Sequence, residues 1–148
     1  MSMTTETRTT IEPNNFDWVS AHAACSVSKV FHQLQLEIRT DIETRNRLST
    51  ENEKSKYFYT CASNGNSLSV FIESQSVEVE GIGVRFTRTP KGIDAYSLAE
   101  RLLFSGTVTL SNDGQCRIKV GEIEYNFWQF RKLTLEDVFF TNVARWRP

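Results

Sequence analysis

The stretch from Phe16 to about Leu48 constrains the fold most, because it can form one long amphipathic helix. No Gly or Pro interrupts the chain between Asn14, the expected N-cap, and Asn64. Apolar residues recur at spacings of three and four, which places them on one stripe of a helix. The stripe comprises Val27, Val30, Phe31, Leu34, Ile38 and Ile42. The solvated face comprises Gln33, Gln35, Glu37, Arg39, Asp41, Glu43 and Arg45.

A continuous helix of this length would be longer than the sheet that it covers. At ~1.5 Å per residue it would reach roughly 50 Å, whereas a strand of six residues spans about 20 Å. The helix therefore overhangs the sheet unless it bends near Ala21–Ser26 or frays after Ile42. An overhanging apolar stripe needs a second partner, and a second copy of the chain can supply it. We therefore expect a homodimer.

An alternation with a period of two follows the polar connector Ser49–Lys56 and indicates β-strands. Two such runs, Lys56–Ala62 and Ser67–Ser74, flank Asn64-Gly65, which is a strong hairpin signal. A two-residue turn at Asn64-Gly65 would place Tyr59 opposite Val70. The first two strands are therefore expected to form a hairpin in that register.

The rest of the chain predicts a third strand, a short helix and a second group of strands. The third strand is Val77–Thr89, with a β-bulge at Gly81 where the apolar residues change parity. Ser97–Glu100 has the pattern of a capping box and would open a short helix to about Leu103. Three further strands, Gly106–Ser111, Gln115–Val120 and Ile123–Phe130, precede a C-terminal helix that opens at Thr134.

Two turns set the register of the second group of strands. Asn112–Gly114 suits a type I turn with Gly114 in the left-handed conformation, which pairs Leu110 with Cys116. Gly121-Glu122 suits a type II′ turn. That turn pairs Lys119 with Glu124, a predicted cross-strand ion pair.

These elements predict one α+β domain over residues 14–148 behind a disordered tail, residues 1–13. Its antiparallel sheet has about six strands in two three-stranded meanders, with a long N-terminal helix, a short middle helix and a C-terminal helix. The element order resembles that of type III secretion chaperones. It also resembles a pleckstrin-homology-like barrel if Ile93–Leu98 forms a strand. Both resemblances concern topology without a motif, and topology alone implies little about function.

The composition of the chain limits the classes of partner that we expect it to bind. A formal net charge of −1 gives no field that would attract nucleic acid, so a nucleic-acid partner is not expected. No apolar run approaches the ~18 residues of a membrane span, so no membrane partner is expected. Three cysteines, Cys25, Cys61 and Cys116, stand far apart without paired spacing. They predict reduced thiols in a cytoplasmic protein.

No motif for catalysis or cofactor binding stands out in the sequence. His22, Cys25 and His32 share the long helix, but about 10 Å separates Cys25 from His32, too far for one metal ion. Alternating carboxylates such as Glu78 and Glu80 are typical of a solvated sheet face. We therefore expect no metal, no cofactor and no catalytic residue.

The aromatic residues of the predicted strands are the most informative feature for function. Contiguous outward aromatics mark a helix-covered layer, a dimer interface or a ligand groove. The candidate interaction surface is Phe58, Phe71, Arg117, Trp128 and Phe130. The sequence thus predicts a non-enzymatic protein-binding or chaperone-like module that self-associates. The alternative is a small-ligand-binding or enzymatic domain with a pocket between the long helix and the sheet. Its lining would be Tyr57, Tyr59, Tyr125 and Phe127.

Overall fold

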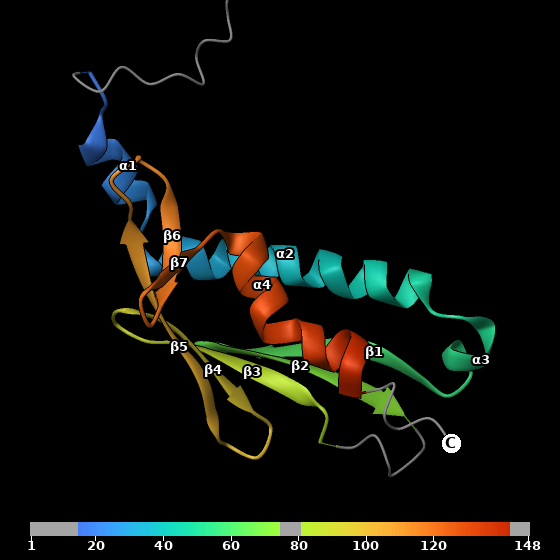
Figure 1. Ribbon diagram of the computed structural model, residues 1–148. Helices are drawn as coiled ribbons and strands as arrows, with labels where there is room; N and C mark the ends of the chain where they lie inside the picture. Colours follow the sequence, from blue (N-terminus) through green and yellow to red (C-terminus); the bar gives the residue numbers. More distant parts are fainter. Residues whose placement is uncertain (1–14, 75–80, 143–148) are drawn as a thin grey trace, which may run out of the picture.

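The computed structural model describes residues 15–74 and 81–142 (Figure 1). The helices are α1 (Trp18–Ala24), α2 (Val27–Leu48), α3 (Glu51–Lys54), α4 (Phe127–Glu136) and the π-helix η3 (Asp137–Asn142). The strands are β1 (Tyr57–Asn64), β2 (Ser67–Ser74), β3 (Gly83–Arg88), β4 (Gly92–Ser97), β5 (Leu102–Leu110), β6 (Cys116–Val120) and β7 (Ile123–Tyr125). The predicted α+β class with a long N-terminal helix is confirmed. The predicted tail, residues 1–13, lies outside the described residues.

The strands form one antiparallel sheet of seven strands in sequential order, β1 to β7. The prediction of two meanders joined by a short helix at Ser97–Leu103 is therefore wrong. Strand β4 ends at Ser97, and after a turn β5 begins at Leu102. Within this turn Glu100 has a φ of 68° and its N–H donates to the Ser97 carbonyl at 3.0 Å. The Glu100 carboxylate pairs with Arg85 at 2.9 Å, which fixes the turn against β3. The pattern Ser97–Glu100 was thus a turn and not a helix cap.

Helix α2 covers one face of the sheet, and α4 with η3 packs beside it on the same face (Figure 1). The predicted apolar stripe of α2 faces the sheet and is buried from Val30 to Ile42, while Val27 is half-buried. From the opposite side the core receives alternate residues of the strands, such as Tyr59 on β1 and Phe86 on β3. Burial of this stripe is what holds the long helix on the sheet.

The predicted continuous helix is interrupted at Cys25 and Ser26, within the region where a bend was expected. Ser26 caps α2, because its Oγ accepts the Lys29 N–H at 3.2 Å. Asp17 caps α1 by accepting the Ser20 N–H at 3.0 Å, whereas the predicted cap Asn14 lies outside the described residues. No residue of α1 is buried, so this short helix contributes little to the core.

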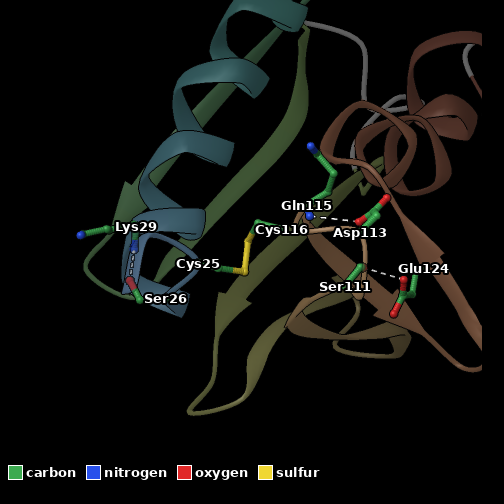
Figure 2. Close-up of a disulfide and its surroundings, with 8 residues drawn as sticks. All are labelled: Cys25, Ser26, Lys29, Ser111, Asp113, Gln115, Cys116 and Glu124. Atoms are coloured by element: carbon green, nitrogen blue, oxygen red, sulfur yellow. Dashed lines mark hydrogen bonds between the residues drawn. A yellow bond between two sulfur atoms is a disulfide. The ribbon is translucent and has the colours of Figure 1, made fainter. Parts of the chain in front are cut away.

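A disulfide joins Cys25 at this helix junction to Cys116 at the start of β6 (Figure 2). The two Cα atoms lie 5.4 Å apart, although 91 residues separate the cysteines in sequence. The prediction of three reduced thiols is therefore wrong, and Cys61 is the free cysteine. The sequence contains no spacing signal for this bridge, because only the folded topology brings α2 and β6 together.

The first hairpin has its predicted faces but not its predicted register. Asn64 pairs with Ser67, so the turn residues are Gly65-Asn66, and Gly65 has a φ of 56°. Every cross-strand partner therefore moves by two residues, and Tyr59 faces Ile72 instead of Val70. A shift of two preserves the side-chain parity, which is why the buried face was predicted correctly.

The third strand differs from the prediction at its start. Strand β3 begins at Gly83, so the predicted bulge at Gly81 is wrong, and residues 77–80 lie outside the described residues. Gly81 nevertheless has a φ of 90°, a conformation that favours glycine. The parity change therefore marks a turn before the strand and not a bulge within it.

The registers of β5, β6 and β7 confirm the two turns predicted for the second group of strands. Leu110 pairs with Cys116 and Lys119 pairs with Glu124, as predicted. The Glu124 carboxylate accepts a hydrogen bond from the Ser111 hydroxyl at 2.6 Å (Figure 2). Among the described residues no ion pair joins Glu124 to Lys119. The predicted strand Ile123–Phe130 ends at Tyr125, because the chain enters α4 at Phe127.

Helix α4 therefore begins seven residues before the predicted start at Thr134. The side chain of Gln129 accepts the Asn126 N–H at 2.8 Å, which satisfies a donor at the start of the helix. The aromatic residues Phe127–Phe130 had indicated a strand with aromatics on both sides. In the helix they point in different directions, which changes their role in the site described below.

We predict that the double variant Cys25→Ser/Cys116→Ser loses about 2–5 kcal/mol of unfolding free energy, because the bridge restricts the unfolded chain. Urea denaturation measures this loss, and Cys61→Ser should change stability by less than about 1 kcal/mol. Titration of thiols in the denatured, unreduced protein should find Cys61 alone. A count of three free thiols would contradict the bridge.

Candidate binding groove

A groove with a volume of about 360 Å³ lies between α2 and the C-terminal helices α4 and η3. This volume is within the range of pockets that hold small ligands or an inserted side-chain cluster. Its lining from α2 is Asp41, Thr44, Arg45 and Leu48. Its lining from α4 and η3 is Trp128, Arg131, Lys132, Leu135, Glu136, Phe139 and Phe140. The lining thus combines five apolar side chains with five charged ones and Thr44.

Arg131 of α4 holds the two walls of the groove together. Its Nη1 lies 2.7 Å from the Glu37 carboxylate, and its Nε lies 2.6 Å from the Asp41 carboxylate. Glu37 and Asp41 are four residues apart, so they share one face of α2. All three side chains are partly buried, which makes these charged hydrogen bonds stronger than surface pairs. Two carboxylates share one guanidinium, so this end of the groove keeps one net negative charge.

Arg45 lies at the floor of the groove and is only 8% exposed. Its Nε donates to the Phe139 carbonyl at 2.9 Å and its Nη1 donates to the Ser49 hydroxyl at 3.0 Å. The guanidinium carbon lies 5.0 Å from the centre of the Tyr59 ring and 5.1 Å from that of Phe140. These contacts partly compensate the buried charge.

The charge of Arg45 has no acidic partner in the described part of the chain. Ion pairs there involve Lys54, Arg85, Arg117, Arg131 and Lys132, and none reaches Arg45. Burial raises the pKa of Tyr57, and the nearby Arg45 charge and a hydrogen bond from the Arg45 side chain oppose this rise, so the Tyr57 hydroxyl is a further neutral neighbour of the guanidinium. Arg45 therefore presents a positive charge at the floor of the groove.

Tyr59 forms the layer below Arg45. Its hydroxyl donates to the Phe139 carbonyl at 3.1 Å, so this carbonyl accepts from both Tyr59 and Arg45. Its ring meets Phe139 edge to face at 5.1 Å. Burial raises the pKa of Tyr59 to about 12, and the nearby Arg45 charge opposes this rise without cancelling it. The hydroxyl therefore remains a neutral donor at physiological pH.

Three large apolar side chains form an exposed cluster at the rim of the groove. Leu48 is 68% exposed, Trp128 56% and Phe140 60%. They come from α2, α4 and η3, so all three elements contribute to the cluster. We call Leu48, Trp128 and Phe140 the rim cluster. Exposed apolar side chains that gather around a groove mark a surface for interaction.

The predicted interaction residues do not form one surface. Phe58 is half exposed and Phe71 half-buried on the sheet face opposite α2. Arg117 and Trp128 do come together, because both line a second hollow beside the groove. Phe130 was expected to point outward from a strand, but it lies on α4 and is fully buried, with its ring centre 6.3 Å from that of Phe86.

The predicted pocket residues are also separated. Tyr57 and Tyr59 lie on β1, while Tyr125 lies on β7 at the other end of the strand order. Tyr57 borders a hollow near α3, and Phe127 borders a different one beside α1. Of the four, Tyr59 lies beneath the groove through its contacts with Arg45 and Phe139, and the ring of Tyr57 packs against it with its hydroxyl close to Arg45.

Sequence reasoning missed Arg45, which it assigned to the solvated face. The spacing contains the signal, because Arg45 follows Ile38 by seven residues and Ile42 by three and so continues the apolar stripe. A charged residue in a stripe of this kind indicates a buried or interfacial cation. Arg131 and Phe140 had no comparable signal, since their roles depend on where α4 begins.

Among the described residues no group of three or more His, Cys, Asp or Glu side chains is placed to hold a metal ion. Cys25, considered above with His22 and His32, is occupied in the disulfide. Within residues 15–74 and 81–142, no helix is both long and apolar enough to cross a membrane. Glu78 and Glu80 lie outside the described residues.

Comparison with known proteins finds no matching family model, no matching curated protein and no matching solved structure. The function is therefore argued from the groove itself.

We predict that Arg131→Met lowers the unfolding free energy by about 1–3 kcal/mol, because it leaves Glu37 and Asp41 partly buried without a cation. Lys132→Met is the matched control. It removes the same charge from the neighbouring position, but from an exposed pair with Glu136, and should cost less than about 1 kcal/mol. Equal effects of the two substitutions in urea denaturation would contradict the bridging role of Arg131.

We predict that stability falls between about pH 10 and pH 12. The pKa of Tyr59 is about 12 in the folded chain and about 10 in the unfolded chain, so the folded state holds this proton more tightly. The stabilisation is complete below pH 10 and is lost as pH rises, at about 2 kcal/mol in total. Tyr59→Phe should show a shallower loss over this window in urea denaturation. An equal slope would contradict the shifted pKa.

Proposed function

We propose that this chain is a non-enzymatic protein-binding module that self-associates through the groove between α2 and α4. The observation that carries the proposal is the rim cluster, Leu48, Trp128 and Phe140, which is exposed around a groove already partly apolar. Trp residues that can be buried in a contact are frequent anchors of protein interfaces. Trp128 was already a candidate interaction residue in the sequence, and its position on α4 places it at the rim of the groove.

The occupant that we propose is a second copy of the chain. Along α2 the surface charge changes sign, from the acidic end at Glu37 and Asp41 to the exposed Arg47 in the last turn. In a two-fold contact the two α2 helices can lie antiparallel, so that the acidic end of one copy faces the basic end of the other. The groove is thus complementary to itself in charge as well as in apolar character.

The test is the association constant of the protein measured by analytical ultracentrifugation. Trp128→Ala should weaken self-association by about 2 kcal/mol or more, which is roughly thirtyfold, if Trp128 is an anchor. Phe58→Ala is the matched control, because it removes a comparably exposed aromatic ring from the opposite face of the sheet.

The expected result is a dimer that Trp128→Ala dissociates and Phe58→Ala leaves intact. A strict monomer at all micromolar concentrations would overturn self-association. A dimer that depends on Phe58 and not on Trp128 would place the interface on the outer sheet face and would overturn the groove as the docking surface.

The Cys25–Cys116 bridge indicates the kind of cellular compartment in which the protein works. The expectation of a cytoplasmic protein rested on three reduced thiols, and the bridge removes that argument. Structural disulfides persist mainly in oxidising compartments. We therefore propose that the protein works in an oxidising environment, and the thiol titration described above tests this as well.

A further inference from the structure

We infer that the floor of the groove is a binding site for an apolar monocarboxylate, with its carboxylate on Arg45 and its apolar body along α4 and η3. The inference goes beyond self-association, because it concerns a small ligand at the floor and not the second copy at the rim. It rests on the buried guanidinium and on the chemistry of the walls around it.

The first step is the unbalanced charge of Arg45. A buried charge is costly unless an opposite charge and hydrogen bonds compensate it. The Phe139 carbonyl, the Ser49 hydroxyl and two aromatic rings contact the guanidinium, but all of these partners are neutral. In residues 15–74 and 81–142 no carboxylate reaches it. An anion that entered the groove would therefore find a desolvated, positive partner.

The second step is the geometry of the donors. Hydrogen bonds from Nε and Nη1 hold Arg45 in place, and the Tyr57 and Tyr59 hydroxyls beside its guanidinium are neutral. A planar guanidinium matches a planar carboxylate well. The other cations of the groove are already engaged, since Arg131 binds Glu37 and Asp41 and Lys132 binds Glu136. Arg45 is therefore the group around which an anion would be held.

The third step concerns the charge of the ligand, which we infer to be one negative charge and not two. Asp41 and Glu136 also line the groove and would repel a dianion such as a phosphate monoester. A single uncompensated cation balances a single carboxylate. The walls near Arg45 are apolar, with Leu135, Phe139 and Phe140, and would bury an alkyl or aryl body. The ligand class is thus an apolar acid with one carboxylate.

The experiment is isothermal titration calorimetry of the full chain with decanoate and, in parallel, with decanol as the uncharged analogue. The protein concentration is kept where ultracentrifugation shows a monomer, so that self-association does not compete. Decanoate should bind saturably and at least about tenfold more tightly than decanol, because one charged hydrogen-bonded contact contributes about that much.

Two variants assign the effect to Arg45. Arg45→Met should reduce decanoate affinity to about that of decanol, whereas Lys119→Met removes an equal charge from an exposed position on β6, outside the groove, and should change it by less than about threefold. Circular dichroism checks that each variant folds. If Arg45→Met does not fold, the decanoate–decanol comparison on the wild-type chain decides.

Equal affinity for decanoate and decanol, absence of saturable decanoate binding, or unchanged affinity in Arg45→Met would each overturn the inference. These outcomes are independent of the effect of Trp128→Ala on self-association. A chain that dimerises through Trp128 but ignores decanoate keeps the proposed function and loses the carboxylate site. A monomer that binds decanoate through Arg45 keeps the carboxylate site and loses the proposed self-association.

Discussion

The buried guanidinium of Arg45 is the interaction on which the groove depends. It links α2 to η3 through the Phe139 carbonyl, and it lies between the core ring of Tyr59 and the exposed ring of Phe140. The core, the groove floor and the rim therefore meet at one side chain. A cation in this position is costly for folding unless its neighbours satisfy it, so its retention at the floor of a groove is informative about function.

Two further constraints fix the position of α2. Arg131 bridges Glu37 and Asp41, which holds α4 beside α2. The disulfide between Cys25 and Cys116 fixes the start of α2 to β6, at the far end of the same helix (Figure 2). Helix α2 is thus tied down at both ends, by the bridge at one and by Arg45 at the other, and its apolar stripe supports it between them.

The sequence predicted helix α2 and the turns of β5 to β7 correctly, but it wrongly predicted a short helix at Ser97 and did not predict the long-range contacts. The turn at Asn112–Gly114 and the pairs around it are correct, because turn chemistry and side-chain parity act over a few residues. The first hairpin was shifted by two residues, since both Asn64-Gly65 and Gly65-Asn66 allow a tight turn. The bridge and the burial of Phe130 could not be predicted, because both depend on which elements the fold brings together. For the site, Trp128 was identified but placed on a strand.

The NMR signal of the Arg45 side-chain Nε–H group tests most directly whether the groove has a buried cation at its floor. The structure predicts that this proton exchanges slowly with solvent, because it donates to the Phe139 carbonyl and lies within the core. Nuclear Overhauser contacts should join it to ring protons of Tyr59 and Phe140. Rapid solvent exchange without those contacts would show that Arg45 is solvated, and that the groove has no cationic floor.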